Sequence, residues 1–230
     1  MNNKVDIINI RKKFLEKLQP SGWDEYLAPY INGFEFQIAI NKLKEEKDAG
    51  RLFEPEFKNI FRAFELCPYK DFKVAMIGQD PYPQPGVADG ISFSCSRKDK
   101  CEKSLQYIFR ALYGDYKGKD NNLSRWSTQG VLMLNTALTV EQKKIGSHYN
   151  VWKPFIEYLF SGLNSIVKDR VFILLGKKAQ EWESYLTNQH IISVSHPASA
   201  AYSGGEWNHK DVFNRTNEFL VNNNKKAIEW

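Results

Sequence analysis

Five side chains that could do chemistry stand shortly after apolar runs of the chain: Gln79, Asp80, Tyr82, Asn135 and His196. A carboxylate can orient a water molecule or stabilise a developing cation, and a neutral imidazole can donate to an oxygen that becomes anionic. An asparagine amide both donates and accepts, which suits the Watson–Crick edge of a pyrimidine. Ordinary sugar hydrolases use two carboxylates, so one Asp with one His favours a glycosidic bond whose leaving group is a stabilised anion, such as a nucleobase.

The apolar runs before these residues predict buried strands at 74–77, 131–134, 171–175 and 191–194. Each run is apolar at nearly every position, which is typical of strands with both faces covered. Helical spacing separates the runs, most clearly over 152–167, and strands that alternate with helices imply a parallel sheet. Because ligands bind outside the carboxyl ends of the strands in such sheets, the five side chains should converge on one edge.

The whole chain predicts an α/β fold with three layers, α/β/α, built on a central four-stranded parallel sheet with a helical N-terminal segment. Apolar stripes before residue 74 indicate helices on the flank of the sheet, a weaker repeat over 105–112 indicates another helix, and 212–220 predicts a closing helix. The chain has 230 residues and no internal repeat, so we expect residues 1–230 to form a single domain.

Composition narrows the class of protein. The 32 Lys and Arg against 27 Asp and Glu give a formal charge of +5, which fits a polyanionic partner. The three cysteines form no CxxC pair, so neither a disulfide framework nor a zinc knuckle is indicated, and they suit a reducing compartment. With no secretion signal and no apolar run near the roughly 20 residues that span a bilayer, we expect a cytoplasmic protein without a membrane segment.

Each candidate residue also has an ordinary structural explanation. An Asp-Pro pair after a strand is commonly a turn, an Asn there is commonly a cap, and a His before Pro is often structural. Phe93, within ISFS at 91–94, would ordinarily be a core residue. The joint placement of these residues at one edge of the predicted sheet favours a site over the separate explanations.

Two further segments could contact a nucleic acid. The run RKDKCEK at 97–103 has four basic residues and leads to Ser104 at an expected helix start, where a phosphate could bind, although such runs are commonly solvated surface. The loop 198–210 is rich in small residues and ends in aromatic and basic groups, so it could approach a nucleic-acid backbone closely.

Four motifs carry a family resemblance: GQDPY at 78–82, GISFS at 90–94, GVLMLNTALTV at 130–140 and HP at 196–197. In these motifs the chain resembles family 1 uracil-DNA glycosylases, and the matching order and spacing run from about residue 23 to about residue 220. The resemblance implies a metal-independent, cofactor-free, monofunctional hydrolase that flips deoxyuridine out of DNA and hydrolyses its N-glycosidic bond, which initiates base excision repair.

The resemblance also implies roles for single residues. Asp80 resembles the acid that orients the attacking water and stabilises the oxocarbenium-like sugar, and His196 resembles the neutral donor to uracil O2. Asn135 resembles the residue that reads the uracil edge, and Phe93 resembles the ring that stacks on the base.

The remaining implied residues form the walls of the pocket and the DNA contacts. Gln79 resembles a wall whose backbone contacts uracil, and Tyr82 resembles the side chain that excludes the C5 methyl of thymine. Ser104 aligns with a phosphate-contacting serine, and we expect Ser199 and Tyr202 to contact DNA from the loop after His196.

Three departures from the family pattern lie in segments that the resemblance places next to DNA. Pro83 stands where the family usually has His; HPASA at 196–200 replaces HPSPL and so removes the leucine that fills the vacated stack; and the loop up to His209 is about two residues short. We expect Tyr202 to act as a substitute wedge. The departures leave two alternatives open: a DNA-binding or processivity protein with weak catalysis, and a glycosylase of the same superfamily with a different base choice.

The expected partner is uracil-containing DNA, either single- or double-stranded. A phage-type inhibitor protein is a further candidate partner, whose binding would depend on the altered wedge loop. The resemblance implies a monomer.

Overall fold

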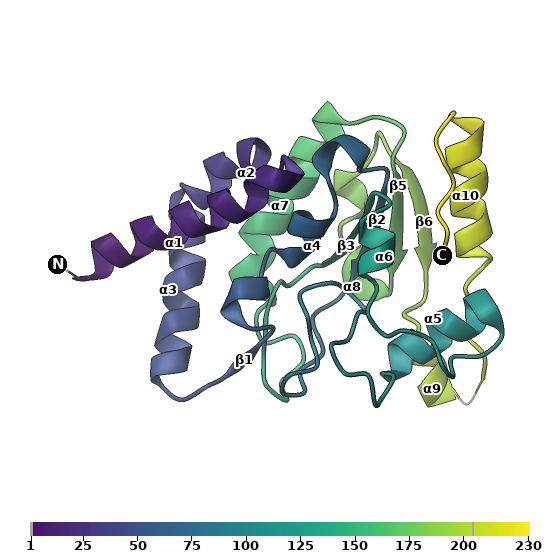
Figure 1. Ribbon diagram of the computed structural model, residues 1–230, viewed down its shortest axis with the longest axis horizontal. Helices are drawn as coiled ribbons and strands as arrows, with labels where there is room; N and C mark the ends of the chain where they lie inside the picture. Colours follow the sequence, from purple (N-terminus) through teal and green to yellow (C-terminus); the bar gives the residue numbers. More distant parts are fainter. Residues whose placement is uncertain (1, 204) are drawn as a thin grey trace.

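The computed structural model describes residues 2–203 and 205–230, which form an α/β fold (Figure 1). The strands are β1 (Phe53–Glu54), β2 (Val74–Gly78), β3 (Val131–Asn135), β4 (Val140–Glu141), β5 (Val171–Leu175) and β6 (His190–Val194). The α-helices are α1 (Asn2–Leu18), α2 (Asp24–Ile31), α3 (Phe34–Asp48), α4 (Arg62–Leu66), α5 (Lys103–Tyr113), α6 (Ser124–Ser127), α7 (Tyr149–Ile166), α8 (Lys177–Gln180), α9 (Ser199–Ser203) and α10 (Val212–Asn222). Short 3-10 turns are η1 (Gln19–Ser21), η2 (Phe57–Asn59), η3 (Tyr69–Asp71) and η4 (Glu183–Tyr185).

Four of the strands form one parallel sheet in the order β3-β2-β5-β6. The register pairs Gly78 with Asn135 and Leu175 with Val194, so the strands end at a common edge. The predicted α/β fold with a central four-stranded parallel sheet is confirmed. A second, antiparallel pair, β1 with β4, was not predicted, because two-residue strands leave no periodicity to detect.

Alternate side chains of each central strand enter two different cores. Ile77 and Leu134 belong to a core shared with helices of the N-terminal segment and with α7. Met76 and Met133 belong to a core shared with α5 and α10. Because the side chains of a strand alternate between its two faces and both faces are covered, the runs are apolar throughout.

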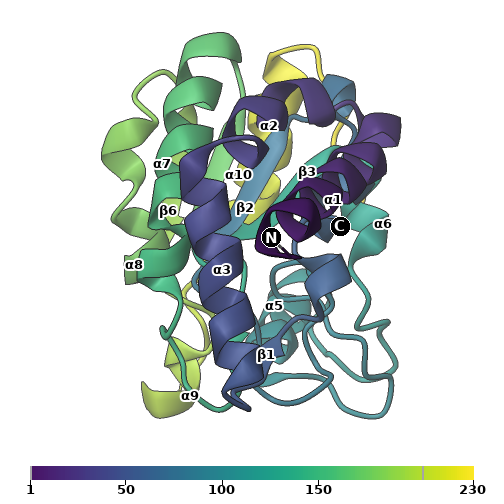
Figure 2. The ribbon, with the colours of Figure 1, turned by 90° about the vertical axis from the view of Figure 1, so that its left-hand side faces the viewer.

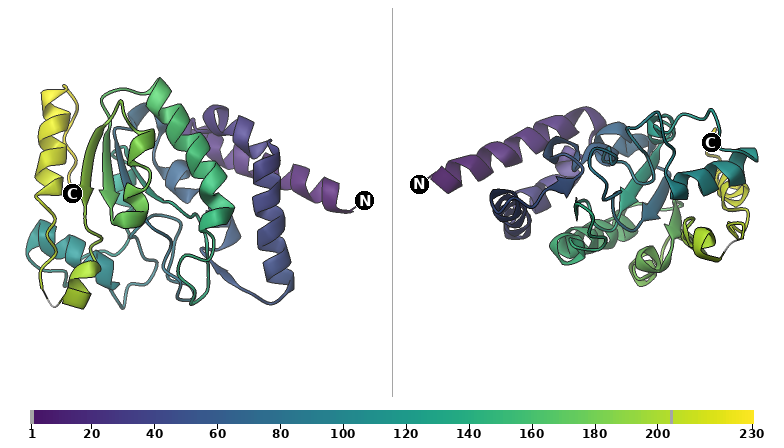
Figure 3. Two further views of the ribbon diagram at one scale, coloured as in Figure 1. Left: turned by 180° about the vertical axis from the view of Figure 1, so that it is seen from behind. Right: turned by 90° about the horizontal axis from the view of Figure 1, so that it is seen from below.

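The views from other sides show how the helices cover the sheet. Figure 2 shows α1, α2 and α3 in front of the strands, and Figure 3 shows α10 on the opposite side of the sheet. The helical N-terminal segment therefore lies on the flank of the sheet, as predicted. Within the part of the chain that the structure describes, no helix is both long enough and apolar enough to cross a membrane.

A buried polar network joins α3, α7 and the segment between β3 and α7. Trp152 Nε1 lies 2.7 Å from Thr139 Oγ1, which lies 2.8 Å from Nδ1 of His148, and His148 Nε2 lies 2.8 Å from Oε2 of Glu46. An indole N–H can only donate, so the Thr139 hydroxyl accepts from Trp152 and is free to donate to Nδ1. His148 then carries its proton on Nε2 and donates it to Glu46.

Replacing Thr139 with Val should lower the free energy of unfolding by about 1–3 kcal/mol, because the Trp152 N–H and the His148 Nδ1 lose their partner in a dry environment. Urea unfolding followed by circular dichroism measures this. The control is Thr128→Val at an exposed position, where we expect a change within about 0.5 kcal/mol. Equal effects of the two substitutions would contradict the network.

Candidate active site

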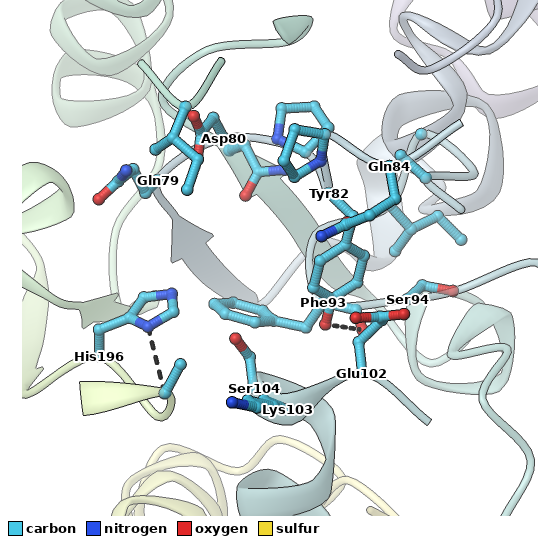
Figure 4. Close-up of a pocket in the computed structure, with 18 of the residues that line it drawn as sticks. Gln79, Asp80, Tyr82, Gln84, Phe93, Ser94, Glu102, Lys103, Ser104 and His196 are labelled. Atoms are coloured by element: carbon cyan, nitrogen blue, oxygen red, sulfur yellow. Dashed lines mark hydrogen bonds between the residues drawn. The ribbon is translucent and has the colours of Figure 1, made fainter. Parts of the chain in front are cut away.

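One cavity of about 670 Å³ lies at the carboxyl ends of the strands, and eight of the nine predicted site residues line it: Gln79, Asp80, Tyr82, Phe93, Ser104, Asn135, His196 and Ser199. Figure 4 shows Gln79 and Asp80 across the cavity from Ser104, with the Phe93 ring between His196 and Tyr82. The ninth residue, Tyr202, is in α9, and its side chain lies outside the described part of the structure.

Asp80 is fixed by a hydrogen bond from another loop. The backbone N–H of Gly146 donates to Asp80 Oδ2 at 2.6 Å. Burial raises the pKa of the Asp80 carboxyl, while the bonds from Gly146 and from the Gln79 side chain act in the opposite direction. The Gln79 carbonyl accepts from Thr136 Oγ1 at 2.8 Å and from the Ala137 N–H at 3.1 Å, so the chain direction after β2 is held by residues that follow β3.

His196 is held in one tautomer. Its Nδ1 accepts a hydrogen bond from the Ala198 N–H at 3.2 Å, which places the proton of the neutral ring on Nε2. Burial lowers the pKa of the His196 imidazole, which favours this neutral form. The Ser199 hydroxyl donates to the His196 carbonyl at 2.7 Å. Gly176 packs so closely against His196 that an added Cβ would lie only 2.8 Å from the His196 Cβ. The neutral His196 ring therefore offers its Nε2–H as a hydrogen-bond donor and adds no charge to the cavity.

Asn135 and Phe93 approach each other over a glycine. A Cβ added to Gly78 would collide with Oδ1 of Asn135 and would lie 3.0 Å from the Phe93 ring. Phe93 has a φ of 62°, a left-handed conformation that bulky residues rarely adopt, and its ring centroid is 5.8 Å from that of His196. The Ser92 N–H holds this turn by donating to the Met133 carbonyl at 3.1 Å. Phe93 is both buried and part of the cavity wall, so the core explanation and the site explanation apply together.

Tyr82 forms a rigid wall of the same cavity. Its hydroxyl donates to the Phe93 carbonyl at 3.1 Å. Burial raises the pKa of the Tyr82 phenol well above its ordinary value, so the group stays neutral. Ser104 is the second residue of α5, and it is buried in the lining of the same cavity.

The structure adds features that sequence reasoning missed. Gly146 holds Asp80 through its backbone, and a backbone N–H leaves no signal in a side-chain pattern. The carboxylate of Glu102 is buried beside the cavity, although the sequence indicated only a basic run there. The segment after His196, expected to be a flexible loop, contains the helix α9. Pro83 also lines the cavity, and its carbonyl accepts from the Lys143 N–H at 2.9 Å.

Comparison with known proteins decides the family. The profile described as the uracil DNA glycosylase superfamily matches residues 64–221, which is more than half of the chain. The chain belongs to the uracil-DNA glycosylase superfamily. The resemblance seen in the four sequence motifs is thereby confirmed.

Members of this superfamily match nearly the whole chain. Uracil-DNA glycosylase 1 of Listeria innocua is 37% identical over 214 residues, which cover 90% of this chain and 96% of that protein. The uracil-DNA glycosylase of Pseudomonas aeruginosa is 37% identical over 238 residues, covering 100% and 98%. The crystal structure of the mimivirus uracil-DNA glycosylase superposes with a TM-score of 0.84 at 26% identity, covering 94% of this chain and 88% of that one. A variant of the mimivirus protein has been solved in complex with UGI, at the same TM-score of 0.84.

The electrostatics of the site are testable by NMR. We expect the His196 ring to titrate below the ordinary histidine pKa of about 6.5, with its proton on Nε2 in the neutral form, and the Asp80 carboxyl to titrate above about 3.9. Nitrogen-15 and carbon-13 titrations measure both values, and the spectra of His196→Gln and Asp80→Asn assign the signals. A His196 signal that titrates above the ordinary value, or a proton on Nδ1, would contradict the geometry.

Proposed function

We propose that this cavity binds a deoxyuridine flipped out of DNA and that Asp80 and His196 hydrolyse its N-glycosidic bond. The protein is a uracil-DNA glycosylase, a hydrolase that acts in base excision repair. The observation that best supports these residue roles is the fixed tautomer of His196, because it offers a neutral N–H donor in the cavity that also contains the fixed Asp80 carboxylate.

The proposed reaction breaks the bond between C1′ of the sugar and N1 of uracil. The electron pair goes to the base, and the Nε2–H of His196 donates to uracil O2 as negative charge develops there. Asp80 stabilises the cationic sugar, orients a water towards C1′ and takes up the proton that the water releases. Because His196 is neutral, the leaving group departs as a hydrogen-bonded anion and the histidine keeps its proton.

The proposed specificity for uracil comes from the shape of the cavity and from the side-chain amide of Asn135. Asn135 reads the edge of uracil, and its Oδ1 lies over Gly78, where no side chain fits. The Phe93 ring stacks on the base, and the Gln79 backbone forms a wall. Tyr82 occupies the space of the C5 methyl group of thymine, and its hydrogen bond to the Phe93 carbonyl keeps the ring from moving aside.

The residues proposed to contact DNA are chosen by their positions beside the cavity. Ser199 is exposed at the start of α9 beside the cavity, and Ser104 lies at the start of α5, so both could approach phosphates that flank a flipped nucleotide. Tyr202 remains the proposed wedge. We propose that the substrate is single- or double-stranded, because the departures at Pro83 and in the wedge segment leave Tyr82, Phe93 and Asn135, the residues proposed to surround the base, unchanged.

The remaining proposals concern assembly and partners. We propose that residues 1–230 act as one monomeric, cytoplasmic unit that needs no metal or cofactor. Binding of an inhibitor protein is proposed because the mimivirus neighbour was solved in complex with UGI. Co-elution of this protein with UGI in gel filtration would test that proposal directly.

The decisive experiment is excision from an oligonucleotide that carries one uracil, in the presence of EDTA, followed by alkaline cleavage of abasic sites. We expect complete cleavage at catalytic amounts of enzyme. No cleavage at stoichiometric enzyme would instead support a DNA-binding protein with weak catalysis. Parallel oligonucleotides with thymine, hypoxanthine or ethenocytosine test a different base choice.

Replacing Asp80 with Asn should lower the single-turnover rate about 100-fold or more, because the carboxylate that orients the water is lost. In the unaltered enzyme the rate should fall as the pH drops through the raised pKa of Asp80, since only the ionised form is competent. The pH profile of Asp80→Asn should lack this acid limb.

The matched control for this prediction is Asp48→Asn, at an exposed position that ends α3, which should keep both the rate and the pH profile. An acid limb that persists in Asp80→Asn would show that another group is responsible.

Replacing Tyr82 with Ala should lower the preference for uracil over thymine by about 10- to 200-fold, which is what one methyl group is worth in a tight pocket. Tyr82→Phe keeps the ring and removes only the hydrogen bond to Phe93, so it should keep most of the preference. The measurement is the ratio of single-turnover rates on matched uracil and thymine oligonucleotides. An unchanged ratio in Tyr82→Ala would refute the proposed role of the ring.

A further inference from the structure

A second hollow, of about 430 Å³, lies at the end of the sheet opposite the uracil cavity, away from α5 and α9 in Figure 1. Its walls come from segments that directly precede β2, β3 and β5 and from the chain after α10. Five cationic side chains line it: Lys70, Lys73, Arg170, Lys225 and Lys226. The hollow falls in the size range of small-molecule pockets, about 300–1,000 Å³.

The positive charge of this basic hollow is poorly compensated. The five cations face one lining carboxylate, that of the exposed Asp71. Lys226 has an ion pair with Glu229 at 3.6 Å, but both partners are about four-fifths exposed, and such pairs are weak. In residues 2–203 and 205–230, the other four cations form no ion pair within 4.0 Å.

Two of the cations, Lys73 and Arg170, are each anchored to a backbone carbonyl. Lys73 donates from Nζ to the Lys226 carbonyl at 2.8 Å, and burial together with the Lys226 charge lowers the pKa of its amine. Arg170 donates to the Lys168 carbonyl at 2.7 Å, while its Nε is buried without a hydrogen-bond partner. The Arg170 guanidinium also lies over the Phe72 ring, with its Cζ 6.0 Å from the ring centroid. A guanidinium with unused donors beside several amines is the arrangement that binds phosphate oxygens.

The basic hollow is distinct from the uracil cavity. The five-residue strand β2 separates the two, which corresponds to about 16 Å at 3.3 Å per residue. No residue lines both. A few nucleotides bound around a flipped uracil would therefore leave these five cations uncovered.

We propose that the basic hollow binds a phosphate group, supplied either by a free polyphosphate or nucleotide or by the backbone of a second nucleic-acid segment. Lys70, Lys225 and Lys226 attract the anion from solvent, and Arg170 with Lys73 meets its oxygens inside the hollow. The anion would balance the positive charge that Asp71 and Glu229 leave uncompensated. This site is additional to the proposed uracil chemistry and does not depend on it.

The test uses the triple variant K70Q/K225Q/K226Q, which removes three of the five cations and keeps the half-buried Lys73 and Arg170. A matched control, K12Q/K13Q/K47Q, removes the same charge from exposed positions on α1 and α3. Calorimetric titration with inorganic tripolyphosphate, at about 50 mM salt where phosphate contacts are strong, gives the dissociation constants. We expect the triple variant to bind at least about tenfold more weakly than the control, because each lost contact weakens phosphate binding.

A second arm separates the two sources of phosphate. Binding of a uracil-free duplex of 20 base pairs is measured over a range of salt concentrations with the same two variants. If the triple variant weakens both ligands and flattens the salt dependence, the hollow takes a nucleic-acid backbone; if it weakens tripolyphosphate alone, the hollow takes a free polyphosphate. Either result supports a phosphate site.

Excision of uracil from a short single-stranded oligonucleotide should be equal in both variants, which shows that they are folded and keeps the result independent of the proposed chemistry. A single variant, Arg170→Gln, should also lower tripolyphosphate affinity, because the guanidinium meets the anion in the proposed site. Equal tripolyphosphate affinity in the triple variant and the control would overturn the proposal, since binding would then follow total charge alone.

Discussion

The parallel hydrogen bonding of β2 with β3 and β5 is the constraint on which both ends of the molecule depend. It places Gly78 opposite Asn135, and the pairing of β5 with β6 makes those two strands end together before His196. The chain leaves every strand at the same edge, so the residues that follow the strands collect around one cavity. The residues that precede the strands collect at the other edge for the same reason, which is how Lys73 and Arg170 come to share a hollow.

Within the cavity, one physical cause acts on two groups with opposite results. Burial raises the pKa of Asp80 and lowers the pKa of His196, because in each case it disfavours the charged form. The hydrogen-bond partners of Asp80 and His196 then favour a different charge state for each group. Asp80 accepts a hydrogen bond from the Gly146 N–H, which favours its anion, whereas the His196 Nδ1 accepts from Ala198, which suits the neutral ring. An anion and a neutral donor can thus share one cavity, as departure of an anionic base requires.

The loop that supports Asp80 is fixed by packing far from the chemistry. Gly146 lies between Thr139 and His148 in the sequence, and these two residues are hydrogen-bonded to each other and to Glu46 in α3 and Trp152 in α7. Through Glu46, α3 therefore holds the segment that follows Gly146, in addition to covering the sheet. This contribution is a matter of tertiary contacts, since Glu46 reaches His148 across 102 positions of sequence.

The sequence by itself determined the sheet and the types of residue at its edge. Continuous apolar runs predicted strands covered on both faces, and Asp80, Asn135 and His196 were recognisable because they follow such runs and belong to a family pattern. The strands β1 and β4, the helix α9, the bond from Gly146 and the basic hollow could not be predicted, because they arise from short segments or from backbone groups of distant loops. The spacing of apolar residues in a sequence indicates only which faces of a helix or strand are buried. The pairing of particular atoms, and with it the pKa shifts of Asp80 and His196, was decided by the tertiary structure, which partly buries both groups and supplies their hydrogen-bond partners.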